Sequence, residues 1–202
     1  TVGGSWSRVN SGHYNKAFST TSTIAGGYIN SNYGSHAFIG GGWWNIVYGA
    51  TYSAVIGGEH SWTYSYACSI AGGQDNIIGS SYGFIGGGQY NNVYGWIGTV
   101  SGGYDTWASS DWSTVIGGLY NYASSYHTSI SGGLYNGVYS SHAHVNGGAS
   151  NYIYVAHTMI AGGNNNYMYG YSASILGGQY NSCYSSWSSV LGGQYNRAWN
   201  SW

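Results

Sequence analysis

A Gly-Gly pair that returns every fifteen residues is the feature that most constrains the fold of this 202-residue chain. The pairs run from residues 26–27 to residues 192–193, and the step is constant except for one step of sixteen near Gly49-Ala50-Thr51. Ser11-Gly12 fits the same series one step earlier. Each repeat is numbered here from position 1, the first residue of the pair, to position 15. A period this regular indicates a repeat architecture.

Several other positions of the repeat keep one residue type. Position 2 is always Gly, and position 5 is Asn in eleven of thirteen copies, with Ser61 and Thr106 as the exceptions. Position 14 is Ile or Val in all thirteen copies, position 12 is always small, and position 7 is mostly small or apolar. Side chains of a strand alternate between its two faces. The pattern therefore predicts one strand over positions 11–15, with 12 and 14 facing inward, and a second over positions 6–8, with 7 facing inward.

Fifteen residues are too few for a helix pair or a propeller blade, but they suit one coil of a narrow β-solenoid. We expect Gly-Gly-x-x-Asn to turn one corner and the Gly/Ser pair at positions 9 and 10 to turn the other. The absence of Pro fits, because every coil must donate its backbone N–H groups to a neighbour. The sequence therefore predicts an all-β fold, a single parallel β-solenoid (β-roll or β-helix) over residues 1–202. It would contain about thirteen coils, with partial coils at residues 1–10 and 192–202.

Identical residues recur because each coil would lie on the previous one, about 4.8 Å away. The Ile/Val column would then form a thin core, and the Asn column a ladder of side-chain amides that bond to neighbouring backbone. We expect this structural ladder at Asn121, Asn136, Asn151, Asn166, Asn181 and Asn196.

The segment IAGGQDNIIGSSYGFIGGGQYN, residues 70–91, resembles the repeats of trimeric autotransporter adhesin heads and related phage-fibre segments. The resemblance covers nearly the whole chain through one short pattern. It implies a left-handed parallel β-roll that serves as a binding or stalk module, and an extracellular location or one on a cell or virion surface. The chain departs from such heads in its Tyr and Trp content and in lacking the heptads of a coiled coil.

The low charge of the chain excludes several functions. Only 3% of the residues are charged and the net charge is −1, so there is no basic surface for nucleic acid and little repulsion between copies. No apolar run approaches the roughly 20 residues of a transmembrane helix, so no membrane-spanning segment is expected. The lack of a signal peptide and of an initiator Met suggests a processed or trimmed chain.

Aromatic residues fill the outward positions of the repeat, and position 8 is aromatic in ten of thirteen coils. These rings can stack on one another and cover the backbone of the solenoid. They can also form a contact surface, since large aromatic patches rarely face water without a partner. As this binding or assembly surface we single out Tyr33, Tyr48, Tyr64, Tyr94, Tyr139, Tyr154, Tyr169, Tyr184 and Trp199.

The histidines are weak metal candidates. His127, His142 and His157 occupy position 11 of consecutive coils, and His144 lies at position 13 of the middle coil. Stacked imidazoles about 5 Å apart suit a transition metal, but no Asp or Glu lies in that stretch to orient the rings. We favour a polar ladder of neutral imidazoles and expect neither a metal nor any other cofactor.

Cysteine and acidic residues give no sign of catalysis. Cys68 and Cys183 occupy inward positions too far apart for a disulfide, so we expect two small buried side chains. Glu59 and Asp75 would be near neighbours in adjacent coils, but a pair of catalytic carboxylates needs a cleft that a solenoid face does not offer. We therefore expect a protein that is not an enzyme.

Three functions remain in order of preference. The first is an extracellular structural protein that assembles into a fibre or surface appendage, with copies of itself as partners, head-to-tail and side by side. The alternative is an adhesin or phage-fibre module whose aromatic columns hold carbohydrate. The third, an ice-binding solenoid, would need a regular rank of Thr, whereas Thr is scattered here.

The preference for a fibre rests on the ends of the repeat. The pattern runs to both termini without a cap, and an uncapped solenoid leaves strand edges that pair readily with another chain. We expect Thr1 to Trp6 to meet the coil near Trp199 of the next copy. Arg8, Lys16 and Arg197 place positive charge near both ends, but salt screens so few charges.

Overall fold

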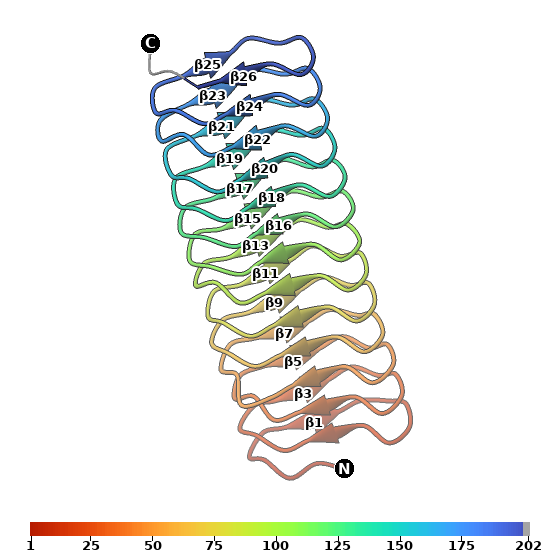
Figure 1. The fold of residues 1–202 in the computed structure, drawn as a ribbon. Coiled ribbons are helices and arrows are strands. Elements are labelled where there is room, and N and C mark those ends of the chain that lie inside the picture. The colour runs from red at the N-terminus through yellow and green to blue at the C-terminus, as the bar shows by residue number, and fades with distance from the viewer. Residues whose placement is uncertain (200–202) are drawn as a thin grey trace. The chain divides into compact units, whose positions relative to one another are not determined.

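The computed structural model describes residues 1–199 and divides into two compact units, residues 1–103 and 104–202. Both units are built in the same way, from parallel coils that stack along the unit, and no helix occurs among residues 1–199. Each full coil contributes two strands of two residues (Figure 1). The predicted fold class, an all-β parallel solenoid of about thirteen coils of roughly fifteen residues, is confirmed.

The first unit contains thirteen strands. They are β1 (Arg8–Val9), β2 (Lys16–Ala17), β3 (Thr23–Ile24), β4 (Ser31–Asn32), β5 (Phe38–Ile39), β6 (Ile46–Val47), β7 (Ala54–Val55), β8 (Trp62–Thr63), β9 (Ser69–Ile70), β10 (Ile77–Ile78), β11 (Phe84–Ile85), β12 (Asn92–Val93) and β13 (Thr99–Val100).

The second unit contains the remaining strands. They are β14 (Trp107–Ala108), β15 (Thr114–Val115), β16 (Tyr122–Ala123), β17 (Ser129–Ile130), β18 (Gly137–Val138), β19 (His144–Val145), β20 (Tyr152–Ile153), β21 (Met159–Ile160), β22 (Tyr167–Met168), β23 (Ser174–Ile175), β24 (Ser182–Cys183), β25 (Ser189–Val190) and β26 (Arg197–Ala198).

Within each unit the odd-numbered strands form one parallel sheet and the even-numbered strands another. The register places each residue beside its equivalent in the next coil, as in the pairing of Ile130 with Val145. The sixteen-residue coil keeps this register, since Val47 still pairs with Thr63. Gly49 (φ +64°) and the buried Ala50 take up the extra residue at a corner of this coil.

The core consists of the three predicted inward columns. The Ile and Val side chains of position 14 are fully buried from Ile24 to Ile175, and Val190 is nearly so. Position 7 faces them with small and apolar residues such as Val47, Ile78 and Cys183, all completely buried. The small residues of position 12, such as Ala143, fill the remaining space. The predicted burial of Ile130 and Ile160 is confirmed, because both have no exposed surface.

The predicted extent of the strands was wrong. Strands cover only positions 6–7 and 13–14, because the residues at positions 4 and 11 have left-handed backbone conformations. Tyr135 at position 4 has φ +56°, and His142 at position 11 has φ +53°. Residues with a Cβ adopt this conformation at a cost of roughly 1–2 kcal/mol. The two corners are therefore turned by non-glycine residues, many of them aromatic, as well as by the Gly-Gly pair.

The two glycines of the pair have different roles. At position 2, Gly148 has φ +87°, and a Cβ there would collide with the carbonyl oxygen of Gly163 in the next coil. Glycine is therefore required at position 2. At position 1, a Cβ on Gly162 or Gly177 would meet no atom within 4 Å. Accordingly, Ser11 replaces this first glycine in the earliest pair.

Candidate binding and assembly surface

The position-8 rings form stacked ladders on the surface of each unit. In the second unit the ring centroids of Tyr139, Tyr154, Tyr169 and Tyr184 follow one another at 5.5, 5.3 and 5.2 Å, with interplanar angles of about 10°. Trp199 stacks on Tyr184 at 4.2 Å. These side chains are 38–60% exposed. Because the ring faces cover each other along the ladder, the ladder presents mainly ring edges and hydroxyl groups to solvent.

The same column is less regular in the first unit. Phe18 stacks on Tyr33 at 5.4 Å and 9°, but Tyr33, Tyr48 and Tyr64 are tilted by more than 50° from one another. Tyr94 is exposed as well. All nine side chains predicted for the surface are thus exposed at position 8 of their coils, four in the first unit and five in the second.

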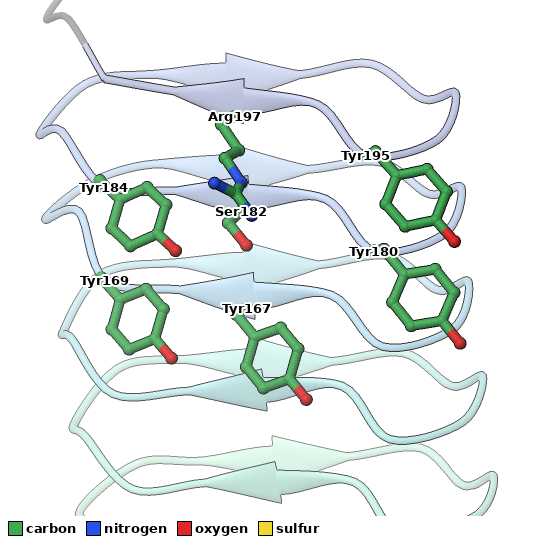
Figure 2. Close-up of a pocket in the computed structure, with 7 residues that line it drawn as sticks. All are labelled: Tyr167, Tyr169, Tyr180, Ser182, Tyr184, Tyr195 and Arg197. Atoms are coloured by element: carbon green, nitrogen blue, oxygen red, sulfur yellow. The ribbon is translucent and has the colours of Figure 1, made fainter.

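A hollow of about 320 Å³ lies on this face in the second unit (Figure 2). Ser182 on β24 lies at its centre, where neighbouring coils carry larger side chains. On one side of Ser182 lie Tyr169 and Tyr184, and on the other side Tyr180 and Tyr195, whose rings stack at 5.0 Å and 2°. Tyr167 and Arg197 complete the lining along the column. Phenol groups and one guanidinium group thus surround a space open to solvent.

Crowding among the tyrosines affects their ionisation. Burial raises the pKa of the Tyr154 phenol, and the neighbouring Tyr169 and Tyr139 raise it further. The pKa of Tyr169 is raised in the same way, first by burial and then by Tyr184 and Tyr167. The raised pKa values mean that Tyr154 and Tyr169 resist ionisation at alkaline pH.

The histidines of position 11 form a stacked column, as the sequence led us to expect. His127 and His142 are 5.4 Å apart, and His142 and His157 are 4.9 Å apart with an interplanar angle of 4°. His144 lies on β19 instead, where its Nδ1 is 2.8 Å from the hydroxyl oxygen of Ser129, and burial lowers its pKa. Among residues 1–199 no three His, Cys, Asp or Glu side chains are arranged to hold a metal.

The Asn column forms a continuous chain of hydrogen bonds in the second unit. The Oδ1 of Asn121, Asn136, Asn151, Asn166 and Asn181 accepts a bond of 3.0–3.1 Å from the backbone N–H of the next Asn. Each Nδ2 donates to the position-1 carbonyl of its own coil and, up to Asn181, to a carbonyl of the next coil. These side chains are fully buried except Asn196, which is exposed.

The two cysteines lie in the core, whereas the acidic residues Glu59 and Asp75 lie in adjacent coils of the first unit. Cys68 and Cys183 are free and buried, and burial raises the pKa of both thiols. Asp75 does lie beside Glu59, since its backbone N–H donates to the Glu59 carbonyl at 3.0 Å. The Asp75 carboxylate, however, contacts His60 Nδ1 at 2.7 Å.

The sequence analysis missed the aromatic residues of positions 3 and 10. Tyr66, Trp96, Tyr126 and Tyr171 at position 10 are exposed and interleave with position 11, as in the edge contact of Tyr66 with Tyr82 at 5.4 Å. Position 3 adds Tyr28, Trp43 and Tyr104. These residues recur at the same two positions of the repeat, so the signal was available in the sequence.

Comparisons with known proteins add no relative to this picture. No protein-family model matches the chain, and no curated protein sequence matches it. In the part of the chain that the structure describes, no helix has the length and apolar character that crossing a membrane requires.

Proposed function

We propose that this chain is a non-enzymatic structural protein of the cell exterior or of a cell or virion surface, which assembles with copies of itself into a fibre or appendage. The observation that carries the proposal is that every coil offers its neighbour the same contacts in the same register. Within each unit, Asn side chains, backbone groups and aromatic rings repeat from coil to coil. Because each coil presents the same contact groups, the end coil of one copy can pair with the end coil of another copy as neighbouring coils pair within a unit.

The composition of the surface favours the same function. With four acidic and three basic side chains in 202 residues, copies of the chain repel one another weakly. Apolar side chains such as Ile56, Ile116 and Leu176 are exposed at the last position of their coils. Exposed apolar and aromatic side chains are typical of an interaction face. Head-to-tail stacking would extend the sheets, and the aromatic columns would join neighbouring solenoids side by side.

Sedimentation velocity over a range of protein concentrations at physiological salt tests the proposal. Assembly should increase with concentration, and Tyr154→Ser with Tyr169→Ser should reduce the lateral part of it. Ser already occupies position 8 at Ser109 and Ser124, so the repeat tolerates this change. The matched control is Tyr126→Ser with Tyr171→Ser at position 10. A monodisperse monomer at all concentrations, or equal losses in both double variants, would contradict the proposal.

A second candidate function, a carbohydrate-binding module of the adhesin or phage-fibre kind, is favoured by the hollow around Ser182. Tyrosine hydroxyls and the Arg197 guanidinium supply donors and acceptors there, and the volume of about 320 Å³ is large enough for a sugar residue. The stacked ladders weigh against it, because they leave few ring faces free to stack on a sugar. Saturable binding of a glycan by monomeric protein, lost in Tyr180→Ser, would favour this candidate over the fibre.

A further inference from the structure

We infer that the first unit carries a binding site for a quaternary ammonium group, formed by Trp43, Trp44, Glu59 and His60. The site is a hollow of about 110 Å³ that these four side chains line. Trp43 and Trp44 occupy positions 3 and 4 of one coil, and Glu59 and His60 occupy the same positions of the next. Trp43 pairs with Glu59 as neighbouring residues of parallel coils. The inference does not depend on the assembly of the chain.

The wall formed by His60 is held in place from three sides. Its ring lies 4.5 Å from the ring of Trp44 and 5.3 Å from that of Trp62. Its Nδ1 lies 2.7 Å from Oδ1 of Asp75, while its Nε2 is buried without a partner. The imidazole is therefore fixed before any ligand arrives, and a preformed wall reduces the entropy that binding costs.

The charge of the hollow is negative. Within residues 1–199 the Glu59 carboxylate has no hydrogen bond or ion pair with another side chain, and Asp75 lies behind His60. The basic side chains of this unit, Arg8 and Lys16, lie three or more coils away, on the order of 14 Å at about 4.8 Å per coil. That distance exceeds the screening length at physiological salt. An unpaired carboxylate at an aromatic hollow attracts a cation.

The walls select the kind of cation. Two exposed indoles and one carboxylate line the hollow, and aromatic rings with a single charged acceptor are the groups that recognise quaternary ammonium ions. A divalent metal needs several oxygen or nitrogen ligands, and a primary ammonium needs more than one acceptor for its three N–H groups. The volume is close to that of four water molecules, which is too little for a sugar ring and enough for a nitrogen with its methyl groups.

Isothermal titration calorimetry of the full chain with tetramethylammonium chloride, at constant ionic strength, tests the inference. One saturable site is expected. Glu59→Gln keeps the shape of the side chain and removes its charge, so affinity should fall by about tenfold or more. Trp44→Ala should abolish binding, whereas Trp44→Tyr, which keeps an aromatic face and protects the fold, should retain most of it. Asp111→Asn, an exposed acid in the second unit, is the charge-matched control and should bind as the unaltered chain does.

Choline and its neutral isostere 3,3-dimethylbutan-1-ol complete the design. Choline should bind and the isostere should not, because only choline carries the charge. Equal binding of the two compounds, undiminished binding by Glu59→Gln, or the absence of saturable binding would each overturn the inference. Binding of a hexose in place of the cations would overturn it as well and would assign the hollow to carbohydrate.

Discussion

Removal of one amide from the Asn ladder should destabilise the second unit strongly. In Asn151→Ala, the backbone N–H of Asn166 loses its acceptor, the Oδ1 of Asn151 at 3.1 Å. Asn166 is fully buried, so water cannot replace this acceptor. The carbonyl of Gly147 loses its donor at 3.0 Å. The carbonyl of Gly163 keeps a second bond, from the backbone N–H of Ala149. Two groups are thus left without a hydrogen-bond partner. An unpaired buried group costs about 1–3 kcal/mol, and the carbonyl of the partly exposed Gly147 costs less. The free energy of unfolding should therefore fall by about 2–4 kcal/mol.

Urea unfolding followed by circular dichroism measures this loss, and hydrogen exchange at Asn166 locates it. The control is Asn146→Ala, which alters an exposed Asn at position 15 of the preceding coil and should change the unfolding free energy by less than about 0.5 kcal/mol. Asn151→Ser tests the chemistry, because Ser61 is buried at the same position in the first unit. Equal stability of Asn151→Ala and Asn146→Ala would refute the claim that the ladder stabilises the coils.

Three further predictions concern the core and pH. Ile130→Asp places a charge in the fully buried column and should cost more than about 4 kcal/mol or prevent folding, as measured by circular dichroism, whereas the exposed Ser131→Asp should be tolerated. The pKa values of Tyr154 and Tyr169 are raised in the folded chain, so the unfolded chain loses these protons first as pH rises. The stabilising contribution of these tyrosines is therefore fully present below pH 10 and should be lost as pH rises above it. Urea unfolding at a series of pH values measures this loss, and Tyr154→Phe should reduce the decrease in unfolding free energy per pH unit. Burial, and then the nearby His142, lower the pKa of His144. The stability that this neutral histidine contributes above pH 6.5 should therefore be lost as pH falls below that value. Urea unfolding should show a smaller loss in His144→Gln.

The periodic columns made the fold predictable. Position 14 had to be inward, because thirteen Ile or Val residues at one spacing leave no other face for a core, and Ile24 to Ile175 are fully buried. The Gly at position 2 was recognised as a corner residue, and its close approach to the next coil explains why no other residue occurs there. Stacking identical coils turns a local preference into a constraint on the whole chain.

The corners were not predictable in the same way. Tyr135 and His142 adopt left-handed backbone conformations that their residue types disfavour, and only the closure of the coil imposes them. For the same reason each strand has only two residues, where alternation alone suggested five residues for one strand and three for the other. Tertiary geometry outweighs intrinsic propensity at these positions.

The candidate surface was predictable in part. The outward column from Tyr33 to Trp199 followed from the repeat, but ring orientation did not, and orientation decides whether faces or edges meet a partner. The hollow beside Glu59 was not predicted, because the sequence suggested Glu59 and Asp75 as a pair. Asp75 turns instead to His60, which leaves Glu59 alone with Trp43 and Trp44.

Electron microscopy of the purified 202-residue chain at physiological salt, combined with fibre diffraction, tests the central claim most directly. Self-assembly through stacked coils predicts filaments with an axial spacing of about 4.8 Å, equal to the spacing of coils within each unit. Discrete particles of single-chain mass at high protein concentration, without that reflection, would contradict the claim that the chain is a fibre-forming structural protein.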